Sequence, residues 1–159
     1  MPDFERVHLA AQGYFELEMY GEAIRVLDTL SFEDQLHSEV LELRVVVEMK
    51  ACRWKKALAA SERLCAVAPD ASIGFIHAAF CLHELGRTRE AREVLLEGPA
   101  SLVNEATYHY NLACYECVLG NLETARAYLD ASVSLDSKLK VFAREDPDLE
   151  PLHPAKKKS

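Results

Sequence analysis

The chain has 159 residues, of which 50% are hydrophobic and 28% are charged. This balance is typical of one folded domain with a substantial core, and it excludes a disordered chain. The net charge of −8 excludes the basic surface that a nucleic-acid duplex or an anionic membrane requires, so neither is expected as a partner. No apolar run approaches the roughly 20 residues of a transmembrane helix, and acidic residues interrupt the N-terminus where a secretory signal would need an apolar stretch. We therefore expect a cytoplasmic protein.

The cysteine content also favours a reducing compartment. The chain has five cysteines, so at least one has no partner within the chain. Several of them lie inside apolar helical patterns, where a free cysteine packs as a small hydrophobic residue. Disulfides are rare in reducing compartments, which agrees with a cytoplasmic location.

A period of 34 residues runs through the sequence from its first predicted helix. Small or apolar residues repeat at this step in two columns, which are Ala11, Val45, Ala79 and Ala113, and then Ala23, Ala57, Ala91 and Ala125. A small side chain lets two helices cross closely, so the pattern predicts one pair of helices per repeat. The expected fold class is all-α, in a single domain over residues 1–152.

In chain order, the predicted units are residues 4–37, 38–71, 72–105 and 106–136. Apolar residues within each unit follow a spacing of three and four, which is typical of amphipathic helices. Gly86 and Gly120 follow the first helix of the third and fourth units, where a left-handed residue ends a helix. The second unit has Cys52 at this position, and the first unit has its glycine later, at Gly21.

The residues after the fourth unit are expected to cover the end of the stack. A capping helix is predicted over residues 137–145, with Leu135, Leu139 and Phe142 in one apolar stripe. Pro147 ends this helix, and the following leucines are expected to fold back onto it. Residues 153–159 complete the chain as a flexible basic tail.

These features resemble the tetratricopeptide-repeat family. That family has 34-residue helix-turn-helix units with small residues at two crossing points, a glycine at the turn and often a closing proline. The segments FIHAAFCLHELGRTREAREVLLEG and YNLACYECVLGNLETARAYLDASVSLD carry the resemblance, and Pro69 lies at the closing position of the second unit. The resemblance covers residues 4–136 and implies a right-handed α-solenoid of antiparallel helix pairs.

The resemblance also implies a function. The first helices of tetratricopeptide arrays line a concave groove that binds proteins or peptides. The corresponding positions here are His8, Gln12, Phe15, Val46, Met49, Ile73, Ile76, Phe80, His83, Tyr110, Cys114 and Cys117. In the third and fourth units these positions carry aliphatic, aromatic and sulfur side chains, so the expected partner is a protein or peptide with apolar anchors.

The sequence also allows other ways in which the groove could be filled. A second copy of the chain, giving a homodimer, is one, and burial of the groove by its own side chains is another. The positions from which some tetratricopeptide domains grip a C-terminal carboxylate hold no Lys or Arg here, so a carboxylate clamp is not expected.

Two further functional hypotheses remain. The stretch FIHAAFCLHELG resembles the third unit of type III secretion translocator chaperones, which implies a chaperone for an apolar segment. A different class is a metal or redox protein that uses Cys114 and Cys117, with His83 as a third ligand. Both cysteines lie inside a helix, away from the helix N-terminus that activates a thiol, so neither a metal nor a cofactor is expected. The sequence has no phosphate-binding glycine loop and no nucleophile elbow, which predicts a protein that is not an enzyme.

Overall fold

The computed structural model describes residues 3–154, and its regular secondary structure in that range is entirely helical. The α-helices are α1 (Phe4–Glu16), α2 (Tyr20–Leu27), α3 (Phe32–Gln35), α4 (Ser38–Lys50), α5 (Trp54–Val67), α6 (Ser72–Glu84), α7 (Thr88–Leu96), α8 (Ala106–Val118), α9 (Leu122–Leu135) and α10 (Leu139–Glu145). Two 3₁₀ helices complete the set, η1 (Ala100–Asn104) and η2 (Pro147–Leu152). Among the residues described, none of the helices has the length and apolar character needed to span a bilayer.

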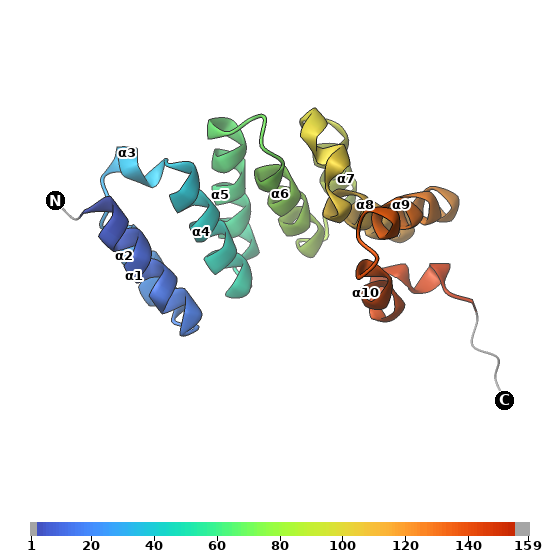
Figure 1. Ribbon diagram of the computed structural model, residues 1–159, viewed down its shortest axis with the longest axis horizontal. Helices are drawn as coiled ribbons and strands as arrows, with labels where there is room; N and C mark the ends of the chain where they lie inside the picture. The colour runs from blue at the N-terminus through green and yellow to red at the C-terminus, as the bar shows by residue number, and fades with distance from the viewer. Residues whose placement is uncertain (1–2, 155–159) are drawn as a thin grey trace.

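The helices form four successive pairs, α1 with α2, α4 with α5, α6 with α7 and α8 with α9. Each pair falls within one of the four predicted units. The pairs follow one another along the long axis of the molecule, from the N-terminal to the C-terminal end (Figure 1), and the second helix of each pair also packs on the first helix of the next. The prediction of an all-α solenoid built from helix pairs is confirmed.

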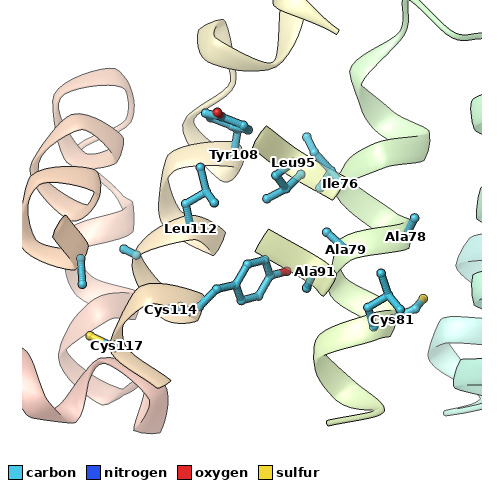
Figure 2. Close-up of a cluster of buried hydrophobic side chains, with 14 of the residues drawn as sticks. Ile76, Ala78, Ala79, Cys81, Ala91, Leu95, Tyr108, Leu112, Cys114 and Cys117 are labelled. Carbon is cyan, nitrogen blue, oxygen red and sulfur yellow. The ribbon is translucent and has the colours of Figure 1, made fainter. Parts of the chain in front are cut away.

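The small residues of the repeat lie where the helices meet. All eight positions have a relative exposure of 0%, and they are Ala11, Ala23, Val45, Ala57, Ala79, Ala91, Ala113 and Ala125. Figure 2 shows Ala79 of α6 beside Ala91 of α7. The backbones can approach closely there because neither side chain extends beyond its Cβ atom.

The four turns between the paired helices share one backbone geometry. In the third unit the Gly86 N–H donates to the His83 carbonyl at 2.9 Å, and the Arg87 N–H donates to the Leu82 carbonyl at 2.8 Å. Gly86 and Gly120 have φ values of 78° and 86°. Equivalent hydrogen bonds close the turns of the first two units, where Glu18 and Cys52 have φ values of 58° and 56°. The repeat therefore conserves the turn itself, even where glycine is missing.

The C-terminal helix differs from its predicted packing. The helix forms as α10, but Leu135 and Phe142 are 53% and 67% exposed, so the predicted apolar stripe does not cover the end of the stack. Only Ala143 of α10 is buried. The leucines of η2 supply the burial instead, with Leu149 at 0% and Leu152 at 5% exposure.

Most of the buried hydrophobic residues belong to one of two clusters. The larger cluster extends from α5 through α9 to α10 and η2. The smaller one joins α1 and α2 to the start of α4, and its members are Val7, Ala11, Leu27, Leu30 and Val40.

Replacing Ala91 by Leu is expected to destabilise the protein by about 1–3 kcal/mol, because the added atoms overpack the crossing with α6. Urea unfolding followed by circular dichroism measures the effect. Glu93→Leu, on an exposed position of the same helix, is the control and should leave the midpoint nearly unchanged. An unchanged midpoint for Ala91→Leu would contradict the crossing described above.

Replacing Cys52 by Gly is expected to stabilise the protein by about 0.5–1 kcal/mol, because glycine adopts a positive φ without the steric cost that other residues carry. The reciprocal change, Gly86→Ala, should destabilise by a similar amount. Denaturant midpoints measure both changes in stability. A loss of stability in Cys52→Gly would contradict the left-handed conformation of this turn.

Candidate functional site

The candidate site is the surface formed by the first helix of each pair, α1, α4, α6 and α8, which we call the first-helix face. The predicted groove residues on its first three helices form an open part. Gln12 is exposed there, and the half-buried members are His8, Phe15, Val46, Met49, Ile73 and Phe80. Phe80 packs against Trp54 of the preceding unit, with ring centroids 5.9 Å apart.

Ile76 differs from the other predicted groove residues of α6 because it is only 8% exposed. Figure 2 shows it beside Leu95 of α7, on the side of α6 that faces α8. Ile76 belongs to the same buried cluster as Tyr108 and Leu112. Its side chain therefore packs between units and offers little surface to a partner.

The first-helix face of α8 is covered by residues 146–153, which we call the C-terminal segment. This segment follows α10 and contains η2, which packs mainly on α8 and also on α10 and α9. The Asp146 carboxylate accepts a hydrogen bond from the Tyr110 hydroxyl at 2.7 Å and lies 3.7 Å from the Cys114 sulfur. Its other oxygen accepts from the Asp148 N–H at 3.0 Å, which starts η2.

A second carboxylate extends the contact to α6. The Asp148 Oδ2 atom lies 2.8 Å from the His83 Nε2 atom, and the His83 Nδ1 atom lies 2.9 Å from the Thr88 hydroxyl. The ring of His83 also packs against Tyr115, at a centroid distance of 4.9 Å. The segment is therefore held by the helices of both the third and the fourth units.

Apolar and backbone contacts complete the attachment. Leu149 and Leu152 are buried in the same cluster as Cys114 and Cys117. The Arg126 guanidinium of α9 donates to the Leu152 carbonyl at 2.6 Å, and His153 Nε2 donates to the Ala143 carbonyl at 2.7 Å. The predicted basic tail lies mainly at residues 155–159, which are outside the described residues.

The structure thus brings together four predicted groove residues, His83, Tyr110, Cys114 and Cys117, under the chain's own C-terminal segment. The sequence analysis expected Leu149 and Leu152 to fold back, but onto the capping helix, and it did not identify Asp146, Asp148 or Arg126 as contacts of this arrangement. A cavity of about 350 Å³ remains between α6, α8 and the segment, and its lining includes Phe80, His83, Tyr110, Asn111, Cys114, Pro147 and Asp148.

Cys114 belongs to a group of three side chains that could together hold a metal ion. The donor atoms of Cys114, Asp146 and Asp148 lie within 4.8 Å of one another, and Cys117 is not part of this group. Burial raises the pKa of the Cys114 thiol well above its usual range, and the two nearby carboxylates raise it further. A thiol binds a metal as the thiolate, so these surroundings favour a protonated Cys114 that donates to Asp146.

The fold is an all-α solenoid of the tetratricopeptide-repeat type. The chain is similar to solved structures of MamA, a protein with such repeats. The MamA RS-1 ArsTM double mutant superposes with a TM-score of 0.76 at 18% identity, over 86% of this chain and 77% of that one. MamA MSR-1 C2 superposes with a TM-score of 0.72 at 16% identity, over 87% and 79%. For MamA from residue 41 to the end, from Desulfovibrio magneticus RS-1, the TM-score is 0.73 at 18% identity, over 86% and 77%.

The scan against protein-family models and the search of curated proteins gave no match. At these identities the similarity to MamA concerns the fold.

The cysteines are expected to differ strongly in reactivity. Cys52 is exposed, whereas burial raises the pKa of Cys65 and of Cys81 to about 11 and that of Cys114 further. Iodoacetamide at pH 8 should modify Cys52 at least about tenfold faster than Cys81 or Cys114, because the thiolate is the reacting species. Peptide mass spectrometry measures the rates, and in urea all the cysteines should react alike. Equal rates in the folded protein would contradict the burial described here.

Proposed function

We propose that this protein is a non-enzymatic scaffold that binds a protein or peptide segment with apolar anchors on its first-helix face. The main support is the C-terminal segment, because a short stretch without regular α-helix already binds there. It uses two buried leucines for apolar contact and two carboxylates for polar contact. This combination of an apolar centre and a few oriented polar groups is typical of peptide recognition.

The open part of the same face supplies the surface for another chain. Val46, Ile73 and Phe80 lie on α4 and α6 and are half-buried, so each has apolar surface that a partner would bury. Glu39 and Glu42 of α4 are exposed beside them, so the polar rim is acidic at that end. A partner with apolar anchors and basic flanking residues fits this part of the face.

A location in the cytoplasm agrees with the five free cysteines. A partner other than a nucleic acid or a membrane agrees with the net charge of −8. A chaperone of the type III secretion kind would use the same apolar surface. A homodimer is the competing occupant, and the exposed Val141 and Phe142 of α10, at 66% and 67% exposure, are a second apolar surface for it.

Selection from a random peptide library against the immobilised protein tests the proposal and supplies the probe. The double variant Ile73→Ser/Phe80→Ser is expected to bind the selected peptides at least about tenfold more weakly, because it removes two apolar anchors. Leu96→Ser is the matched control, since Leu96 lies on α7 and is 52% exposed. Fluorescence anisotropy gives the dissociation constants.

The proposal predicts that the control binds like the wild type. Equal loss in the double variant and in Leu96→Ser would place binding elsewhere. Sedimentation equilibrium over a range of concentrations identifies a second copy as the occupant, if the mass doubles in the wild type and remains single in the double variant.

A further inference from the structure

The C-terminal segment contacts the solenoid much as a separate peptide would. The helix before it, α10, buries only Ala143 and exposes Val141 and Phe142. Pro147 and Pro151 keep the segment out of a regular α-helix. Its position is therefore set by its own contacts, because η2 packs on α8, α10 and α9 and Asp148 meets His83 of α6.

The surface beneath the segment offers hydrogen-bond donors. His83, Tyr110 and Arg126 each direct a polar atom to an oxygen of the segment, at 2.8, 2.7 and 2.6 Å. We call these three residues, with Cys114 and Cys117, the α8 site. Because the tyrosine and the arginine are acting as donors, an acidic or carbonyl-rich ligand satisfies the α8 site and a basic one does not.

The spacing of the segment's contacts defines a pattern. Two carboxylates, Asp146 and Asp148, lie two residues apart, and two buried leucines, Leu149 and Leu152, lie three apart. The α8 site therefore contacts a pair of acidic residues followed by two leucines. The position between the leucines, Glu150, is exposed and does not have to match.

The fit of the segment is incomplete. The residues that line the cavity of about 350 Å³ between α6, α8 and the segment include Phe80 of α6 and Pro147 and Asp148 of the segment. A ligand with a larger side chain at the position of Pro147 would fill this space and gain contact with Phe80.

We propose that the C-terminal segment is a removable ligand of the α8 site, and that the site's partner is a peptide segment with two carboxylates two residues apart, followed by leucines three apart. This inference rests on the proposed function and deepens it, because it assigns a ligand chemistry to the part of the first-helix face that the chain covers itself. A partner gains access by displacing the segment. Because the segment is tethered, it competes at an effective concentration in the millimolar range.

A synthetic copy of residues 145–154, with the sequence EDPDLEPLHP, is the probe. It is added to the full chain carrying Leu149→Ser, which weakens the tethered competitor. The peptide is expected to bind this variant at least about tenfold more tightly than the wild type, in fluorescence anisotropy. A peptide with Asp146→Asn, Asp148→Asn and Leu149→Ser is the negative control, and the full chain with Glu150→Gln should behave like the wild type.

Alkylation of Cys114 reports where the peptide binds. Leu149→Ser should raise the rate at Cys114 at least about tenfold, and the added peptide should lower it again, while Cys81 stays protected throughout. If Cys81 also becomes reactive, the variant has lost its fold. In that case the same alkylation measurement is made on Asp148→Asn, which removes one polar contact but no buried side-chain volume.

The inference is overturned if the peptide neither binds nor protects a variant whose Cys114 is reactive and whose Cys81 is not. It is equally overturned if Cys114 stays protected in both variants, because the segment is then a fixed part of the fold. The proposed function has a separate readout, the loss of binding in Ile73→Ser/Phe80→Ser. A chain that passes that test and fails this one keeps its scaffold function and loses only the assignment of the α8 site.

Discussion

Close contact between helices at small side chains is the constraint on which the rest of the structure depends. Two helix axes can approach to the short end of the usual 8–10 Å only where neither side chain extends far. The repeat places an alanine or valine at each such crossing, and every one of them is completely buried. Since the spacing is constant, successive pairs stack in the same way, and their first helices align on one face.

That alignment creates the first-helix face and also explains its division. On α1, α4 and α6 the face carries half-buried apolar residues, whereas on α8 the chain returns and covers it. The return depends on Asp146, which accepts a hydrogen bond from Tyr110 and at the same time starts η2. The polar contact of Asp146 and the buried leucines of η2 therefore close the end of the stack, where an apolar face of α10 was expected. The covering of α8 therefore depends in part on the hydrogen bond from Tyr110 to Asp146, and a carboxylate of another chain could accept that hydrogen bond instead.

The sequence predicted the helix pairs and their crossings, because both depend on local periodicity. It also located the turns, although glycine is absent from two of them, where Glu18 and Cys52 adopt the left-handed conformation. It missed the orientation of α10, because the stripe of Leu135, Leu139 and Phe142 looks amphipathic whether or not a neighbour is present.

The covering of α8 was beyond sequence reasoning for a different reason. His83 and Asp148 are 65 positions apart in the chain, and no local pattern indicates that they meet. The same limit applies to Ile76, whose helical register agrees with an outward position but whose neighbours α7 and α8 bury it. Its burial depends on how three helices pack together, and the spacing of apolar residues within one helix does not predict that packing.

The division of the buried residues into two clusters affects how the protein loses its structure. Each repeat is stabilised mainly by its neighbours, and the N-terminal cluster includes only residues of α1 and α2, the connection after α2, and the start of α4. The larger cluster has more buried side chains and is closed by η2. Amide exchange should therefore be fastest in α1 and α2, as partial opening of the first unit leaves the remaining three intact. Unfolding of this protein is therefore expected to begin at the N-terminal end of the array.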